Sequence, residues 1–328
     1  MLPIAIDAMG GDRGPAEIVA GARRAAEELS VPILLVGDPD VMGDTGGLEV
    51  LAAREVIAME DDVAAGVRRK KDASVVRAAE AVRDGRASAM LSAGNTGAAM
   101  GSALLRMGRL PGVSRPAIAT PLPVPGSTPT VLLDAGANAE CQPEWLVQFA
   151  QMGAAFAAGR YGIDQPRVGL LSIGEEATKG TGAVKEANAL LQSPAAWAGT
   201  SGRFIGNVEG RDLLTDRVDV VVTDGFTGNV VLKTLEGAMV FMRNAVFGIM
   251  TSTPEAQEAS QALIPLMLPL VKQMDPDSYG GALLLGVDGV CIISHGSSSA
   301  DALVNAVGVA RDMVEGGLVD RLRQSVKA

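Results

Sequence analysis

The chain has 328 residues, of which 48% are hydrophobic and only 3% aromatic, and its formal net charge is −10. This length can bury the core of one large α/β unit or of two smaller ones. The negative charge argues against a general nucleic-acid binder. Cys141 and Cys291 lack the spacing of a metal site, so we expect free thiols and no metal. The first residues form no basic leader, and the longest apolar run, 262–271, is short and broken by proline. Both features favour a soluble, cytoplasmic protein.

Short apolar runs alternate with segments of helical pattern along the chain. Several runs are apolar on both faces, which is typical of buried parallel strands. Strands are expected at 3–6, 33–36, 87–91, 130–133, 167–173, 204–205, 220–222 and 289–293, with an extended segment at 55–58. Helices are expected at 16–29, within 66–83 (capped by Asp72 or Ser74), and at 98–107, 143–158, 183–192, 230–242 and beyond 299. This alternation predicts a three-layer α/β fold with a mostly parallel, Rossmann-like sheet, and we expect residues 1–328 to form one domain.

A polar loop that contains glycine follows most of the expected strands and leads into the next helix; we call each of these loops a corner. Ligands of parallel sheets bind beyond the carboxyl ends of the strands. We therefore expect these corners to converge on one rim and to contact phosphate or substrate. Glycine there can also serve close packing alone, and the aspartates can simply cap helices or turns. The candidates are Asp7, Gly10, Gly11, Gly94, Asn95, Thr96, Gly97, Asp134, Asn138, Glu175, Asn207, Glu209, Asp224, Gly225, Thr227, Gly228 and Asn229.

The stretch 219–237 has the strongest pattern of this kind. A run of three valines precedes the corner 224–229, and a helical segment follows it. Asn229 is a candidate cap for that helix, whose unpaired backbone N–H groups would favour an anion in the corner. Lys233 lies one turn further along and can lean back toward the same place. This stretch therefore predicts a phosphate site.

Known nucleotide and hydrolase templates do not match these corners. The glycines fit neither the dinucleotide fingerprint nor the Walker spacing, and no Gly-x-Ser-x-Gly elbow occurs. His295 is the single histidine, so any histidine-dependent catalysis must use it. It is either a structural hydrogen-bonding residue or a catalytic one. Lys179, Lys185 and Lys233 each follow a strand-end corner, and each is either a surface charge or a ligand of the substrate.

Four consecutive basic residues, Arg68, Arg69, Lys70 and Lys71, interrupt an otherwise acidic sequence. Such a run is either a solvated face or a docking patch for an acidic partner.

Residues 239–278 break the alternation of strands and helices. We expect a helical hairpin that protrudes and packs in a dimer interface, contacts the membrane reversibly through an apolar tip, or does both. The tip residues would be Leu263, Ile264, Leu266, Met267 and Leu268.

Several strings closely resemble the bacterial phosphate acyltransferase family, and the likeness covers nearly the whole chain. They are IDAMGGD at 6–12, VRRKKD at 67–72, SAGNTG at 92–97, GEE at 174–176 with Lys179-Gly180, GNVEGRD at 206–212, DGFTGN at 224–229 and HGSS at 295–298.

This resemblance implies a fold similar to those of isocitrate dehydrogenase and phosphotransacetylase. It also implies transfer of a fatty acyl group from acyl–acyl carrier protein to inorganic phosphate, at the start of phospholipid synthesis and without a cofactor. Phosphate would attack the thioester directly, without a covalent acyl-enzyme. The family's dimeric state and peripheral membrane association imply the same here, with a downstream glycerol-3-phosphate acyltransferase taking the product. We predict catalytic roles for Lys179, Lys185, His295, Asp224 and Asn229, with Lys233 as the next lysine.

Three positions depart from the family pattern. Ala177 stands where an acidic residue is common, Trp145 where a histidine is frequent, and Asp288 where an asparagine is usual. We therefore assign no catalytic role to these three positions. Two alternative functions stay open: a phosphotransacetylase-like enzyme or dehydrogenase acting on a small substrate, and a non-catalytic module that binds the carrier.

Overall fold

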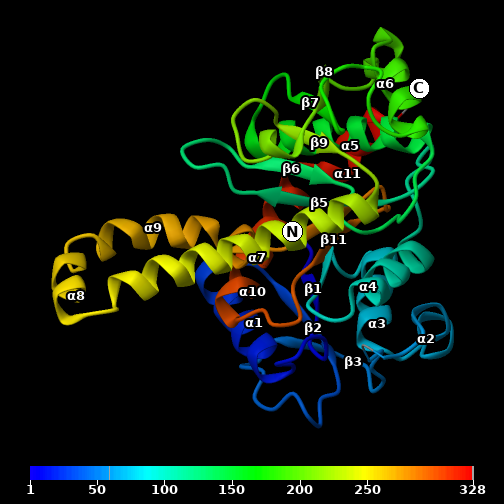
Figure 1. The fold of residues 1–328 in the computed structure, drawn as a ribbon. Helices are drawn as coiled ribbons and strands as arrows, with labels where there is room; N and C mark the ends of the chain where they lie inside the picture. Colours follow the sequence, from blue (N-terminus) through cyan, green and yellow to red (C-terminus); the bar gives the residue numbers. More distant parts are fainter. Residues whose placement is uncertain (59, 327–328) are drawn as a thin grey trace.

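A central sheet with helices on both faces forms the body of the molecule (Figure 1). The computed structural model describes residues 1–58 and 60–326. In that part of the chain the sheet has eleven strands in the order β3-β2-β1-β4-β11-β10-β5-β6-β9-β7-β8. Their bounds are β1 Ile4–Asp7, β2 Ile33–Gly37, β3 Glu49–Ala52, β4 Ala89–Ser92, β5 Ala117–Leu122, β6 Thr130–Leu133, β7 Arg167–Leu171, β8 Arg203–Val208, β9 Val220–Val222, β10 Ala282–Leu285 and β11 Val290–Ile293. The predicted α/β class with a mostly parallel sheet is confirmed.

The two halves of the sheet run in opposite senses. Strands β3, β2, β1, β4 and β11 are mutually parallel, as are β6, β9, β7 and β8. Between them, β10 is antiparallel to both β11 and β5, and β5 is antiparallel to β6. Because β11 and β6 run in opposite directions, their carboxyl ends lie on opposite sides of the sheet, measured along the strand direction. The expectation that all strand-end corners share one rim is wrong, because it assumed one strand direction throughout.

Successive strand residues face two separate hydrophobic cores. Ile4, Ile6 and Val220 pack with α1, α5 and α10, whereas Ala5 and Val221 pack with α2, α3, α4 and α7. This alternation follows from the pleat of the strands, since neighbouring side chains point to opposite faces. The helices are α1 Ala16–Leu29, α2 Val63–Arg69, α3 Ser74–Arg83, α4 Thr96–Ser102, α5 Pro143–Tyr161, α6 Gly182–Leu191, α7 Gly225–Met250, α8 Pro254–Ser260, α9 Ile264–Met274, α10 Ala300–Glu315 and α11 Leu318–Ser325.

The predicted helical hairpin is present as an arm that leaves the body (Figure 1). Helix α7 crosses the sheet and continues outward, and α8 and α9 return toward the body. Large apolar side chains are exposed along the arm, including Phe241 (70%), Ile249 (71%) and Leu266 (75%). In the described residues, no helix combines the length and the apolar character needed to span a bilayer.

Several expected boundaries differ from the structure. Helix α7 begins at Gly225 rather than Val230, because Asp224, not Asn229, caps it by accepting from the Thr227 amide at 2.8 Å. Neither Asp72 nor Ser74 caps α3; Asp72 accepts from the Arg54 amide instead. The expected helix within 66–83 is preceded by the separate α2. Strand β3 lies before the segment expected to be extended, in which Glu55 forms only an isolated bridge.

Candidate active site

The corners after β1, β4 and β11 pack against one another. A Cβ on Gly10 would lie 2.7 Å from the Gly94 amide nitrogen, and one on Gly11 would lie 3.0 Å from the Gly296 carbonyl oxygen. The Asp12 amide donates to that same carbonyl at 2.8 Å. Glycine is therefore required here by close backbone approach as well as by the φ of +91° at Gly11.

Asp7 is buried beneath these corners. Its Oδ2 accepts a hydrogen bond from the Ser92 hydroxyl at 2.7 Å, and its Oδ1 accepts from the Met9 amide at 3.3 Å. Burial raises the pKa of Asp7 above its ordinary value, although hydrogen bonds from Ser74 and Ser92 oppose the shift. The contacts of Asp7 thus tie β1 to β4 and explain its position at a strand end without a ligand.

The corner after β6 is held by Asp134, which is fully buried. Its carboxylate accepts from the backbone amides of Ile118, Gly136, Ala137 and Asn138, and from the Asn138 side chain. Burial is the largest influence on its pKa, which is raised, while these hydrogen bonds act against the rise. Asp134 organises the loop on which α7 begins.

The first turn of α7 lies directly on this loop. The Gly225 amide donates to the Asn138 carbonyl at 2.7 Å, and a Cβ on Gly228 would overlap the Asp134 carbonyl oxygen. Asp224 accepts from both the amide and the hydroxyl of Thr227. Three of the first-turn amides, those of residues 225, 227 and 228, therefore already have protein partners. The chain itself thus binds three of the amides at this helix start; the phosphate site expected here stays a prediction.

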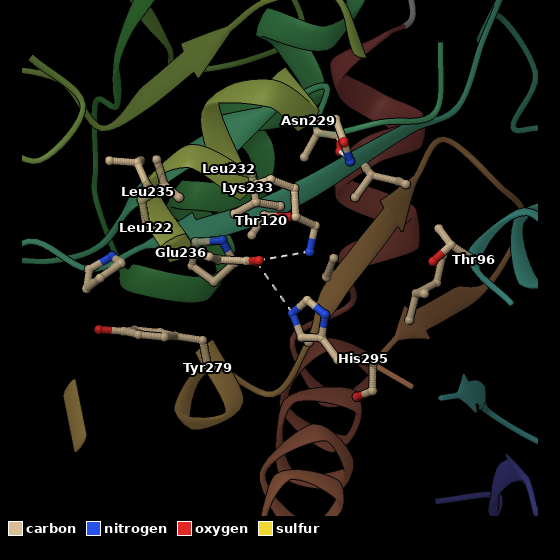
Figure 2. A pocket seen from close by; sticks show the side chains of 18 of the residues that line it. Thr96, Thr120, Leu122, Asn229, Leu232, Lys233, Leu235, Glu236, Tyr279 and His295 are labelled. Carbon is tan, nitrogen blue, oxygen red and sulfur yellow. Dashed lines mark hydrogen bonds and ion pairs between the residues drawn. The ribbon is translucent and has the colours of Figure 1, made fainter. Parts of the chain in front are cut away.

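Further along α7, three charged or titratable side chains meet at a cavity (Figure 2). Glu236 Oε2 lies 2.8 Å from Lys233 Nζ, and Glu236 Oε1 lies 3.7 Å from His295 Nε2. Lys233 and Glu236 come from one face of α7, because residues three apart on a helix are neighbours. His295 comes from the corner after β11. The single histidine is thus brought to a helix from a distant part of the sequence.

Two polar atoms of this cavity lack partners. Glu236 Oε1 and the Thr120 hydroxyl are buried and have no hydrogen-bond partner among the described residues. Buried polar atoms are nearly always paired, and an unpaired one is costly. The cavity has a volume of about 140 Å³, and Thr96 and Asn229 also line it. A polar ligand or water with hydrogen-bond donors would satisfy these atoms.

Four of the predicted site residues therefore share this cavity: Thr96, Asn229, Lys233 and His295. Sequence reasoning missed Glu236 and Thr120. The signal for Glu236 was its spacing of three from Lys233 on a helix, whereas Thr120 lies on a strand that was not expected. Asn229 donates to the Ala135 carbonyl at 3.3 Å, and Asn95 caps α4 by accepting from the Ala98 amide at 3.0 Å.

Lys179 and Lys185 do not line the cavity. Both are exposed, Lys179 on the loop after β7 and Lys185 on α6. That neighbourhood is organised by Asn207, which accepts from Asn188 and donates to the Glu176 carbonyl, both at 2.8 Å. Of the three candidate lysines, Lys233 lines the cavity; the catalytic roles of Lys179 and Lys185 stay predictions.

Two acidic candidates near those lysines are engaged in ion pairs. A hydrogen bond from Arg217 is the main cause that lowers the pKa of Glu175, which also lies 3.5 Å from Arg211. Glu209 lies 2.6 Å from Arg211. Neither carboxylate faces the cavity on α7.

The basic run at 68–71 forms an exposed surface with one exception. Arg68, Arg69 and Lys71 are exposed at and after the end of α2. The Lys70 ammonium instead donates to Asp61 at 2.6 Å and to the Val56 carbonyl at 2.8 Å. Three of the four charges are thus available to a partner.

The positions that depart from the family pattern all lie outside the cavity lining. Ala177 is exposed in the loop after β7. The Trp145 ring lies 4.9 Å from the guanidinium of Arg115, a cation–π contact. Asp288 accepts a hydrogen bond from Arg323 at 2.9 Å. These contacts give Trp145 and Asp288 structural explanations.

The fold has counterparts among solved structures. EutD phosphotransacetylase from Staphylococcus aureus matches 95% of this chain and 94% of its own, with a TM-score of 0.62 and 16% identity. 4-Hydroxythreonine-4-phosphate dehydrogenase from Klebsiella pneumoniae matches 96% of this chain and 100% of its own, with a TM-score of 0.53 and 12% identity. At these identities the likeness establishes the fold alone.

Relatives in sequence are much closer. A phosphate acyltransferase from Elusimicrobium minutum is 48% identical over 98% of this chain and 95% of its own length. One from Pelotomaculum thermopropionicum is 48% identical over 100% of this chain and 96% of its own. A family model described as "Fatty acid synthesis protein" matches residues 2–321. Fold and relatives together define an α/β acyltransferase. Within that class, the chain belongs to the phosphate acyltransferase family.

Proposed function

We propose that this chain transfers a fatty acyl group from acyl–acyl carrier protein to inorganic phosphate, giving acyl-phosphate for phospholipid synthesis. The observation that carries this proposal is the group Lys233–Glu236–His295 at a cavity with unpaired polar atoms, in a chain of the phosphate acyltransferase family. Phosphate near neutral pH is already an anionic nucleophile. The site therefore has to bind it, orient it and stabilise the charge that develops.

In the reaction, a phosphate oxygen attacks the thioester carbonyl carbon. The new C–O bond forms, the C–S bond breaks through a tetrahedral oxyanion, and the carrier's sulfur leaves with the bonding electrons and takes up a proton. Lys233, held by Glu236, supplies a positive charge for phosphate or the oxyanion. His295 in its protonated form donates the proton to sulfur, with Glu236 orienting its ring.

No enzyme nucleophile is needed in this scheme. Both cysteines are free, and burial raises the pKa of the Cys141 and Cys291 thiols to about 12. A thiol with such a pKa holds little of the nucleophilic thiolate at neutral pH. This supports direct attack by phosphate over an acyl-cysteine intermediate.

Exposed charged and apolar side chains suggest three partners: the carrier protein, the membrane surface and a second copy of the chain. The exposed charges of Arg68, Arg69 and Lys71 suit an acidic carrier protein, since charge complementarity speeds encounter and sets orientation. The apolar tip at 263–268 suits reversible contact of a cytoplasmic protein with the membrane surface, where a glycerol-3-phosphate acyltransferase would take the acyl-phosphate. The exposed apolar side chains of α7 also suit a homodimer interface.

Labelled orthophosphate tests the reaction directly. Incubation with a long-chain acyl carrier thioester should give labelled acyl-phosphate and free carrier thiol in equal amounts. Product from acetyl-coenzyme A but not from the carrier would instead establish a small-molecule phosphotransacetylase. Binding of carrier without consumption of phosphate would establish a non-catalytic module.

A further inference from the structure

A second cavity opens between the two long helices of the arm and meets the first. It has a volume of about 410 Å³ and is lined by α7 and α9. Glu236, Met239, Met274 and His295 line both cavities. The polar site therefore continues directly into a groove between α7 and α9, which we call the arm groove.

The lining of the arm groove is apolar and adaptable. Met239, Met242, Met267 and Met274 contribute four thioether side chains, and Val246 and Val271 lie on opposite helices. Methionine side chains adjust to the shape of flexible apolar ligands. The remaining charged lining residues, Arg243 and Asp275, are exposed. Such a lining suits an alkyl chain.

The length of the arm groove matches part of a fatty acyl chain. Its α7 wall runs from Glu236 to Phe247, which at 1.5 Å per residue is about 16 Å. With C–C bonds of about 1.5 Å, an extended alkyl chain advances about 1.3 Å per carbon, so about twelve carbons fit.

We propose that the arm groove binds the alkyl chain of the acyl donor, with the thioester carbonyl at the Glu236–His295 end. This inference rests on the proposed function and adds the site that receives the chain. The ligand that fills both cavities must carry a polar reacting group directly on an apolar chain, as an acyl thioester does. A free membrane lipid would leave the polar end without a reacting group.

Blocking the groove should change the preference for chain length. Val246→Trp and, from the facing helix, Val271→Trp place a large ring in the groove. The measurement is kcat/KM for carrier thioesters with about eight and about sixteen carbons, because each buried methylene contributes about fourfold in affinity. The ratio of long-chain to short-chain kcat/KM should fall at least tenfold in both variants. Leu190→Trp, at an exposed apolar position of α6 outside the groove, is the control and should leave the ratio unchanged.

Three results would overturn the proposal. One is an unchanged ratio in both groove variants. Another is a change of oligomeric state, measured by light scattering, that accounts for the loss and marks the groove as an interface between copies. The third is an effect confined to binding of anionic lipid vesicles, which marks it as a membrane contact.

Binding of octyl and hexadecyl phosphate, measured by calorimetry, separates the groove from the reaction. If the wild type makes no acyl-phosphate but binds the longer phosphate more tightly, and Val246→Trp abolishes that advantage, the groove stands and the proposed function fails. If the wild type forms acyl-phosphate but binds both probes equally, the proposed function stands and the arm groove does not bind the alkyl chain.

Discussion

Glu236 has two carboxylate oxygens in different surroundings. One is paired with Lys233 on the same helix, whereas the other is buried, faces His295 at 3.7 Å and has no hydrogen-bond partner among the described residues. That distance exceeds a hydrogen bond, and catalytic contacts are often longer before substrate binds. Glu236 is thus placed to orient Lys233 and His295 without taking part in bond formation.

Glu236→Gln should lower kcat by about 10²-fold, because an amide neither forms an ion pair with Lys233 nor places a negative charge beside His295. The measurement is acyl-phosphate formation at saturating phosphate and donor. Glu258→Gln, at an exposed position on α8, is the matched control and should keep kcat. A change in KM alone would refute the orienting role and make Glu236 a residue of substrate binding.

Asp7 offers a test that depends on pH. Burial raises its folded-state pKa, so the native protein holds this proton more tightly than the unfolded chain does. The free energy of unfolding therefore loses a contribution as pH rises from the ordinary carboxyl pKa through the raised one. Asp7→Asn lacks this titration, so its unfolding free energy relative to the wild type should increase over that window. Urea unfolding across the range measures the difference; parallel curves would contradict it.

At the scale of elements, α7 connects the two halves of the sheet. Its first turn is packed on the corner after β6, and seven residues after Asn229 it reaches the corner after β11 through Glu236. Gly225 and Gly228 allow the first contact, because their missing side chains let the backbones approach. The position of Glu236 against His295 depends on this anchor.

Gly228→Ala should destabilise the protein by about 3 kcal/mol, because the new methyl group would overlap the Asp134 carbonyl oxygen. Gly237→Ala, on the same helix, is the control, since a methyl group there would have no atom within 4 Å. Alanine is favoured over glycine inside helices by up to about 1 kcal/mol, so this variant should be at least as stable as the wild type. Equal urea midpoints for the two variants would show that the close approach of Gly228 to the Asp134 carbonyl does not contribute to stability.

The sequence predicted most elements but not how they combine. Strands such as 130–133 and 220–222 were recognisable because they are apolar on both faces. By contrast, β5 and β10 were not expected, and these two strands reverse the direction of the sheet. Their pairing is a long-range property that no local pattern records. For the same reason, Lys233 and His295 could be proposed singly, whereas their meeting at Glu236 required the structure.

At the scale of the whole molecule, charge sets a condition on any acidic partner. With a net charge of −10, the protein as a whole repels an acidic carrier, and a local basic surface has to offset that repulsion. Arg68, Arg69 and Lys71 form such a surface at and after the end of α2, a helix that packs against α4. Thr96, the first residue of α4, lines the polar cavity. A carrier bound at this surface would contact α2, which packs against α4, and α4 begins at the polar cavity.

Reversing two of these charges tests the docking surface. In Arg68→Glu/Arg69→Glu, the KM for the carrier-bound donor should rise about tenfold at low salt, with a smaller rise at high salt because ions screen exposed charges. Lys70 is left unchanged, since its bonds to Asp61 and the Val56 carbonyl support the fold. Arg203→Glu/Arg321→Glu, at exposed positions at the start of β8 and on α11, changes the net charge equally and is the control for added negative charge elsewhere. If the control raises KM as much as Arg68→Glu/Arg69→Glu does, net repulsion rather than a docking patch explains the effect. An unchanged KM in Arg68→Glu/Arg69→Glu would place the carrier on another surface.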